Sequence, residues 1–458
     1  YSSRDIETAC RRDINFMYLL EGKPVPDHAT FARFISLHFA QCSKKTFAEV
    51  SELLYSLGEI SGKSIFIDGT KIESAANKYT FVWKKAVTKN QAKLFDKILV
   101  FVEECENLYG FRIAYNGKVS LHTLKRLRKK LCRIRQEEGI AFVHGTGRRK
   151  TCLQKSLETL KTYIAKLKEY NKKLYVCGER NSYSKTDPDA TFMRMKEDHM
   201  LNGQLKPAYN VQIAVENYFI VHGYVSSDRT DYNTLIPVLE KHKNAFGSIL
   251  EEVTADSGYC SEKNLLYLKR NEISSYIKLQ DHEKRKTRAY SEDISKYYNM
   301  RTGIFEDEQF YICHDGRELR HLRTESKEQD GYTQTFEVYG CADCSGCEHK
   351  ARCLYKYDAE KDAEKNKVMK INEQWEELKE RSHANIQSER GILKRQTRSI
   401  QTEGHFGDIK ENENFRRFNY RSADKVYKEF MLYAIGRNIN KYHRFLYEKL
   451  RKFEGKTA

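Results

Sequence analysis

The chain has 458 residues, and its 81 Lys and Arg outnumber its 64 Asp and Glu, so its formal net charge is +17. A single hydrophobic core seldom serves so long a chain, so we expect two or three structural units. The excess positive charge favours a polyanionic partner such as nucleic acid, although solubility alone is a competing explanation. No apolar run approaches the roughly 20 residues that cross a bilayer, and the first ten residues are polar, so we expect neither a membrane partner nor a signal peptide.

Residues 1–60 are predicted to be helical. Ser2, Ser3 and Asp5 can cap a first helix, and a second can start at Asp27, after two prolines. A third helix is expected from Lys45 to Leu57. Three short helices in a basic chain are compatible with a helix-turn-helix-like DNA-binding region and equally with a plain helical bundle.

A short apolar run at Ser64–Ser74 leads directly into Asp68 and Gly69. This pattern predicts a buried strand that presents an acid, although an Asp that caps a turn would look the same. Helical segments dominate the next stretch, from about residue 80 to 180. They are interrupted by a glycine-containing basic loop, whose cations can contact DNA phosphates or merely face solvent: Arg148, Arg149 and Lys150.

Strands and helices alternate from Ser182 to about residue 280. Residues 208–215 and 218–225 are predicted to form a hairpin, followed by a helix at 230–242 and a strand at 248–255. A helix at 261–270 and a strand at 273–279 complete the order. The pattern indicates a mixed α/β domain over residues 61–280, with the helical segment as an insertion.

Asp256 repeats the setting of Asp68, because it too follows a buried strand and has a glycine close behind it. Two carboxylates at one sheet edge repel each other unless a cation lies between them. Two Mg²⁺ or Mn²⁺ ions at such a place can activate water and stabilise the leaving oxygen of a phosphodiester. The alternative is two unrelated turns at strand ends.

A third carboxylate is available in the C-terminal part, which is predicted to be helical from residue 363 to 398 and from 423 to 453. Glu403 and Lys410 are seven residues apart and share a face if the helix is continuous. One could bind metal while the other meets a phosphate. On its own, this segment is equally typical of a charged surface helix.

Five cysteines fall in a basic segment at residues 281–362 that we expect to be rich in loops. Their short spacing is typical of structural zinc sites, with metal-free thiols or an Fe–S cluster as alternatives. The other seven are scattered, as in a reduced cytosolic protein. The candidate ligands are Cys313, Cys341, Cys344, Cys347 and Cys353.

Five motifs together resemble the DDE-type insertion-sequence transposases, whose catalytic core is RNase H-like. They are I-D-G-T-K-I-E-S at 67–74, D-P-D-A-T-F-M at 187–193, Y-N-V-Q-I-A-V at 209–215, A-D-S-G-Y at 255–259 and T-E-G-H-F-G-D-I-K at 402–410. The resemblance implies that Asp68, Asp256 and Glu403 bind the catalytic metal ions, and that residues 363–458 complete the core. It also implies that four of the cysteines bind zinc, with Cys341 as the spare.

The resemblance further implies cleavage at the ends of a mobile element and strand transfer into target DNA. The protein would act on double-stranded DNA as a homodimer or a higher assembly, in the bacterial cytoplasm at the nucleoid. One departure concerns the family pattern Tyr-x2-Arg-x3-Glu-x6-Lys: Arg398 lies one residue too far from Glu403, and the Tyr is missing. A catalytically inactive zinc-containing DNA-binding protein and a related two-metal nuclease are the alternatives.

Overall fold

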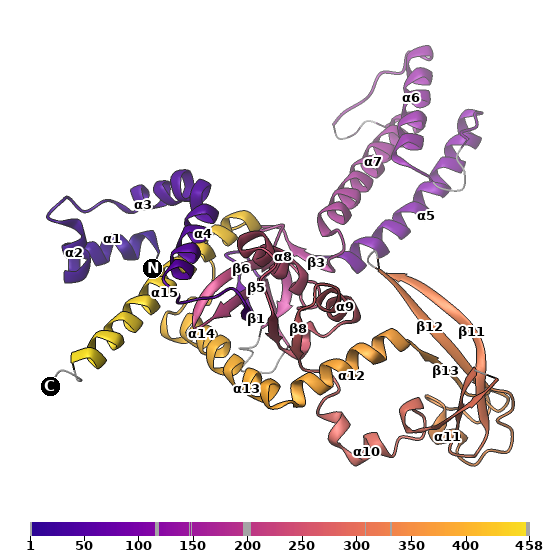
Figure 1. The fold of residues 1–458 in the computed structure, drawn as a ribbon. Coiled ribbons are helices and arrows are strands. Elements are labelled where there is room, and N and C mark those ends of the chain that lie inside the picture. Colours follow the sequence, from indigo (N-terminus) through magenta and orange to yellow (C-terminus); the bar gives the residue numbers. More distant parts are fainter. Residues whose placement is uncertain are drawn as a thin grey trace.

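A six-stranded mixed sheet lies at the centre of the computed structural model (Figure 1). The structure describes residues 2–114, 119–145, 147, 149–195, 203–306, 308–329 and 332–454. The strands of the central sheet are β1 (Ser64–Glu73), β4 (Thr191–Arg194), β5 (Leu205–Glu216), β6 (Phe219–Ser226), β7 (Glu252–Ala255) and β8 (Ser274–Ile277).

The strand order identifies the core. β5 runs antiparallel between β1 and β6, whereas β7 and β8 follow on the other side of β1 and run parallel to it. The resulting order β6-β5-β1-β7-β8 is that of an RNase H-like sheet, so the predicted mixed α/β core is confirmed. β4 extends the sheet by pairing with the first residues of β5.

Alternating side chains of β1 explain why both faces of this sheet are covered. Ile65 and Ile67 point to one face, where they meet α8 (Leu235–Phe246) and α9 (Glu262–Arg270). Ile72 points to the other face and packs in the cluster that includes α15 (Ala423–Glu454). The central strands are therefore buried on both sides, as their almost continuous apolar sequences indicate.

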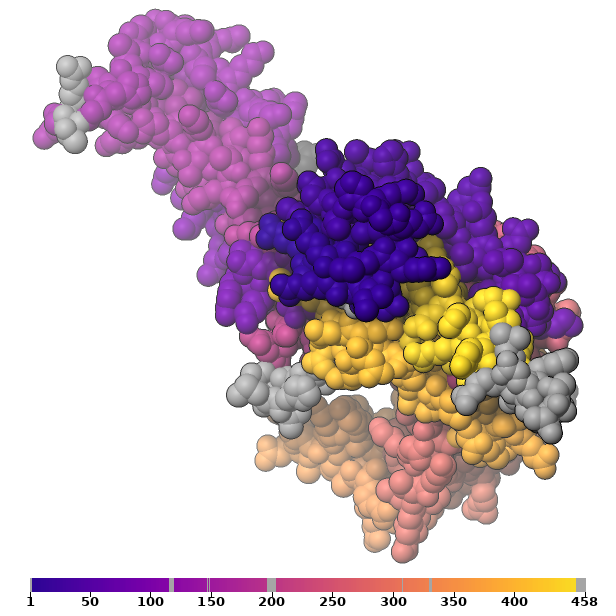
Figure 2. All heavy atoms as spheres, turned by 90° about the vertical axis from the view of Figure 1, so that its left-hand side faces the viewer, coloured from indigo at the N-terminus to yellow at the C-terminus, as the bar shows by residue number. Residues whose placement is uncertain are grey.

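The N-terminal helices lie beside α15, as Figure 2 shows for the indigo and yellow segments. Ser2 and Asp5 form the expected capping box of the first helix. Phe47 and Leu54 of the last of these helices pack into the core next to the sheet. The helices are α1 (Ser3–Arg12), α2 (Ile14–Leu20), α3 (His28–Phe34) and α4 (Ala40–Ser56), with a π-helical turn at Ile35–Phe39 between the last two.

A helical arm, Lys84–Cys177, projects from the core (Figure 1). It consists of α5 (Lys84–Tyr109), α6 (Leu121–Glu137) and α7 (Cys152–Cys177), which bury a hydrophobic cluster of their own. A short ladder between β2 (Phe81–Trp83) and β3 (Ser182–Ser184) closes its base. The arm thus leaves and rejoins the core at one place.

The segment after β8 differs from the expectation of a loop-rich region. Short helical turns, including α10 (Arg288–Ser291), lead into a five-stranded antiparallel sheet. Its strands are β9 (Arg301–Phe305), β10 (Glu308–Ile312), β11 (Glu318–Gln329), β12 (Tyr332–Cys341) and β13 (Val368–Ile371), and α11 (Lys350–Cys353) lies between the last two. Glu262 of α9 fastens this sheet to the core by accepting hydrogen bonds from Tyr332 (2.8 Å) and Asn372 (2.9 Å).

The C-terminal helices return the chain to the central sheet. α12 (Glu373–Gln387) and α13 (Glu389–Arg398) lead into a π-helical turn at Ser399–Glu403, α14 (Gly404–Gly407) and a second π-helical turn at Asp408–Asn412. Helix α15 then passes over the sheet. Among the residues that the structure describes, no helix is long and apolar enough to cross a membrane.

Candidate active site

Asp68 and Asp256 occupy matching positions on adjacent parallel strands. Ile67 and Ala255 form the last pair of the β1–β7 ladder, and the two acids follow these residues. Asp68 is buried and accepts a hydrogen bond from the Gly69 N–H (2.8 Å), whereas Asp256 is exposed and accepts one from the Ser257 N–H (2.6 Å). The backbone thus fixes both carboxylates at one edge of the sheet.

Gly69 is required beside Asp68 because a side chain comes across from the neighbouring strand. A Cβ at this position would lie 2.4 Å from the Nε2 of Gln212, its partner on β5. Gln212 accepts a hydrogen bond from the buried Tyr259 hydroxyl and donates one to Asp231 (2.9 Å). The glycine therefore makes room for a polar network under the site.

Asp231 is a further carboxylate near the site, and the sequence interpretation did not single it out. Burial raises the pKa of Tyr259 well above its usual value, and the negative charges of Asp231, Asp68 and Asp256 add to the shift. The phenol thus lies in the negative field of all three acids, while its hydrogen bond goes to Gln212. Asp231 lies in the first turn of the helix predicted at 230–242, where an Asp is ordinary, so no signal in the sequence separates it from such a residue.

A row of basic residues on α13 lies along β7 and β1 of the central sheet. Arg390 and Lys394 both bind the buried Glu252 of β7, at 2.5 and 2.6 Å. Burial opposes ionisation of this acid, but the hydrogen bonds from its two partners outweigh burial and lower the pKa of Glu252. Arg398 follows four residues after Lys394 and therefore lies on the same face of the helix, with its guanidinium at Asp68.

Arg398 joins the first and third of the predicted catalytic acids. Its guanidinium donates to Oδ2 of Asp68 (2.9 Å) and to Oε1 of Glu403 (3.2 Å). The Thr402 hydroxyl also donates to Asp68 (3.2 Å). The π-helical turn at Ser399–Glu403 accommodates one residue more than an α-helical turn, so Arg398 and Glu403 face each other although they are five residues apart.

Glu403 is exposed, as Asp256 is, with 57% of its side chain accessible. Its second oxygen accepts a hydrogen bond from the Ser399 hydroxyl (2.9 Å). In the described part of the chain, no three His, Cys, Asp or Glu side chains lie close enough together to hold a metal ion. Asp68 and Asp256 nonetheless suit Mg²⁺ chemically, because this ion needs only one or two carboxylates and keeps several waters. Glu403 forms an ion pair with Arg398 instead.

The predicted DNA-binding cations lie in different surroundings. Lys410 is buried in the second π-helical turn rather than exposed on a continuous helix. Arg149 is exposed, and Lys150 is paired with Glu158 at 2.6 Å. Both belong to the loop between α6 and α7, in the helical arm, whereas Arg148 lies outside the described residues.

The five predicted zinc ligands line one small cavity of about 20 Å³. Cys341, Cys344 and Cys353 come from the end of β12, the following loop and α11, and Cys313 from the end of β10. All five are free thiols, and burial raises the pKa of Cys341 to about 11. They line the same cavity, but within the described residues no three of them lie close enough together to hold a metal ion, so the tetrahedral Zn²⁺ site stays a prediction.

Comparison with known families finds two matches. A family model described as a transposase DDE domain matches residues 312–443, and one described as Transposase domain (DUF772) matches residues 1–37. These two matches support an insertion-sequence DDE transposase. Searches of curated proteins and of solved structures return no significant match.

The two matches cover different parts of the chain. The longer one contains Arg398, Glu403, Lys410 and the five clustered cysteines. Asp68 and Asp256 lie in the segment between the matches. Their assignment therefore depends on the geometry of the sheet and on the motifs around them.

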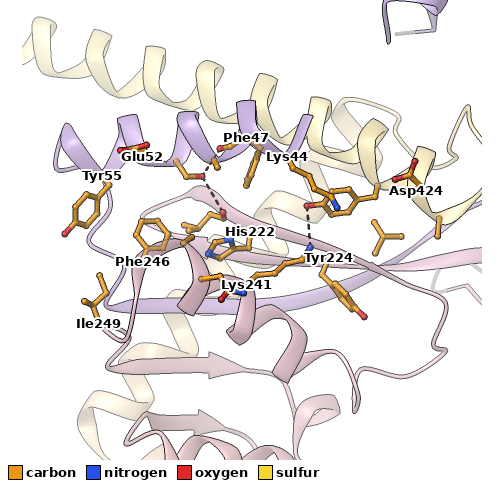
Figure 3. Close-up of a pocket in the computed structure, with 18 residues that line it drawn as sticks. Lys44, Phe47, Glu52, Tyr55, His222, Tyr224, Lys241, Phe246, Ile249 and Asp424 are labelled. Carbon is orange, nitrogen blue, oxygen red and sulfur yellow. Dashed lines mark hydrogen bonds between the residues drawn. The ribbon is translucent and has the colours of Figure 1, made fainter. Parts of the chain in front are cut away.

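A larger cavity, of about 960 Å³, lies away from these acids (Figure 3). It is bounded by side chains of α4, β6, α8 and α15, and none of the predicted catalytic residues lines it. Lys241 donates to the carbonyl of Gly223 (2.9 Å), and burial, aided by nearby Lys44, lowers its pKa to about 8. Next to it, Nε2 of the buried His222 lies 3.1 Å from Nδ1 of the buried His242.

Proposed function

We propose that this chain is a DDE transposase, which hydrolyses a phosphodiester at each end of its element and joins the freed 3′-hydroxyl to target DNA. The observation that carries the proposal is the matched placement of Asp68 and Asp256 on adjacent parallel strands. Glu403 is linked to the same place through Arg398. The protein would work on double-stranded DNA, as a homodimer or a higher assembly, at the nucleoid of a bacterial cell.

Each residue has a role that its surroundings support. Asp68 and Asp256 would offer carboxylate oxygens from rigid strands, and Glu403 would add a third from the helical side. Two Mg²⁺ or Mn²⁺ ions bound there would activate water and stabilise the leaving oxygen. Arg398 neutralises Asp68 and Glu403. A metal ion bound to these two acids would replace its guanidinium, which could then donate to a DNA phosphate.

Replacing Asp68 by Asn tests this assignment, because Asn keeps the shape but loses the charge that holds a cation. Cleavage of a labelled duplex carrying an element end, in Mg²⁺ or Mn²⁺, should fall by about 100-fold or more for Asp68→Asn and for Asp256→Asn. Gel analysis of nicked and strand-transfer products measures both steps. Asp424→Asn, at an exposed acid paired with Lys428, is the matched control and should cleave like the parent.

Equal cleavage by the parent and both variants would contradict the assignment of Asp68 and Asp256 as catalytic acids. The open position of Glu403, and the lack of three gathered ligands in the described residues, favour one alternative: a zinc-containing DNA-binding protein without catalytic activity. It would bind DNA without cleaving it in either metal. A related nuclease would cleave without producing strand-transfer products.

A further inference from the structure

The positive charge of the chain is concentrated in one part of the molecule. The helical arm, Lys84–Cys177, contains 23 Lys and Arg against 8 Asp and Glu, a net charge of +15. The whole chain carries +17, so all other residues together contribute only +2. The polyanionic partner that the composition indicates is therefore a partner of the arm.

Helix α6 presents much of this charge on one face. Leu124, Leu127 and Leu131 are buried in the core of the arm. At 100° per residue, the side opposite these leucines carries four exposed cations: Lys125, Arg126, Lys129 and Arg133. They extend over about 12 Å along the helix, at a rise of 1.5 Å per residue.

These four cations have no acidic partner within the described residues. Their neighbours differ: Lys130 donates to the carbonyl of Arg112 (2.7 Å), and Arg135 donates to that of Ile140 (3.3 Å). Like charges at this spacing repel each other and cost helix stability. A face that keeps such a cost on an exposed helix is suited to an anion that arrives from outside.

We propose that this face of α6 binds the phosphate backbone of double-stranded DNA. The inference rests on the proposed function in that DNA is the substrate, and it places part of that DNA on the arm. The 12 Å length of the cationic face is comparable to the roughly 12 Å width of the major groove, so its ends can reach phosphates on both sides of a groove. Contacts of this kind position DNA without reading its sequence.

Two other polyanions fit less well. A basic helix that lies on a membrane needs a free apolar face, but that of α6 is buried against α5 and α7. Single-stranded nucleic acid is held by stacking on aromatic rings, and α6 contains no Phe, Tyr or Trp. Figure 1 shows the arm projecting away from the central sheet, where a duplex has access to it.

The test uses the full chain with all four residues changed to Gln: Lys125→Gln, Arg126→Gln, Lys129→Gln and Arg133→Gln. Binding to a 30-bp fluorescent duplex of arbitrary sequence is measured by anisotropy from low to moderate salt. We expect binding at least 10-fold weaker and a plot of log K against log salt that is shallower by about 2 to 4, since each lost phosphate contact removes about 0.9. Thermal unfolding should show equal or greater stability, because repulsion is removed.

Two controls separate this face from net charge. Exchanging Lys for Arg and Arg for Lys at the four positions keeps the charge, and should keep affinity within about threefold of the parent. Neutralising four exposed cations outside the arm, Arg301, Lys356, Lys361 and Lys365, changes the net charge equally and should weaken binding less.

Unchanged affinity and salt slope in the α6 variant would overturn the inference, as would an equal loss in the variant outside the arm. Loss of binding to vesicles of anionic phospholipid, with DNA binding intact, would also overturn it. This test is independent of the catalytic acids. The α6 variant can lose DNA binding even if Asp68→Asn cleaves normally, and it can keep DNA binding even if Asp68→Asn is inactive.

Discussion

Cys341 and Cys344, three residues apart, make opposite kinds of hydrogen bond. The thiol of Cys341 donates to the carbonyl of Asp343 (3.2 Å), whereas the sulfur of Cys344 accepts from the N–H of Lys367 (3.3 Å). A zinc-bound thiolate can accept a hydrogen bond but has no proton to donate. The hydrogen bond of Cys344 could therefore persist when its sulfur binds zinc, whereas that of Cys341 would be lost.

We predict that Cys341→Ser retains one zinc per chain, while Cys344→Ser loses it. The physical reason is that Cys313, Cys344, Cys347 and Cys353 suffice for a tetrahedral site. Zinc content of the purified proteins, measured by elemental mass spectrometry, decides between them. Zinc loss in Cys341→Ser with retention in Cys344→Ser would reverse the assignment, and no zinc in the parent protein would remove the site.

Single residues differ in how far their roles could be predicted. The acids at positions 68 and 256 stand out because each ends an apolar strand, a local pattern. The reason for Gly69 is not local: the side chain that occupies the space of its Cβ belongs to Gln212, on another strand. Asp231 was missed for the same reason, since only the fold brings it to Tyr259.

Among the elements, the π-helical turn at Ser399–Glu403 resolves the spacing of the last motif. Counting residues on an α-helix puts Arg398 one position too far from Glu403, yet the two form an ion pair at 3.2 Å. A π-helical turn is an α-helical turn with one inserted residue. The departure from the family pattern is therefore an insertion within the helix, and it keeps the arginine beside the acid.

Deleting the inserted residue provides a test at this scale. Ile400 is 62% exposed within the π-helical turn, so its removal should give an α-helical turn with Arg398 still beside Glu403. We expect the free energy of unfolding, from urea titration, to change by no more than about 1 kcal/mol. Deleting Leu393, 61% exposed in α13, is the matched control.

The control should cost more than about 3 kcal/mol, because it turns Arg390 by about 100° relative to Lys394 and breaks their shared pairing with Glu252. Equal losses for the two deletions would contradict the insertion model.

The two sheets were not equally predictable. Strands of the central sheet are buried on both faces, and their apolar runs are visible in the sequence. β9 and β11 carry charged and polar residues on both faces, so the alternation that marks a half-buried strand is absent there. For this reason the sequence predicted a basic region rich in loops where the structure has a sheet.

Across the whole molecule, buried histidines join units that lie far apart in the sequence. His222 of β6 contacts His242 of α8, which in turn donates from Nε2 to the carbonyl of Gly62 (2.7 Å). His405 donates from Nε2 to the carbonyl of Tyr218 (2.8 Å), between the C-terminal helices and the β5–β6 hairpin. Burial favours the neutral form of all three rings, and the His222–His242 contact also needs one ring nitrogen without a proton, so these contacts couple the assembly of the core to pH.

Burial lowers the pKa of His222 to about 3, with His242 adding to the shift, and burial together with Arg437 lowers that of His405 to about 4. An unfolded histidine has a pKa near 6.5. Between pH 6.5 and about 4 the unfolded chain therefore binds protons that the folded chain does not, and stability must fall as pH falls through this window. Each histidine contributes at most about 1.4 kcal/mol per pH unit.

We predict that the unfolding temperature decreases from pH 7 to pH 5, and decreases less in the double variant His222→Gln and His405→Gln. Glutamine retains an amide N–H near the position of Nε2 but does not titrate, so the comparison concerns the slope with pH rather than stability at one pH. His122→Gln, an exposed histidine on α6, is the control for loss of an imidazole. Parallel pH profiles for the parent and the double variant would show that other groups govern the acid sensitivity of the fold.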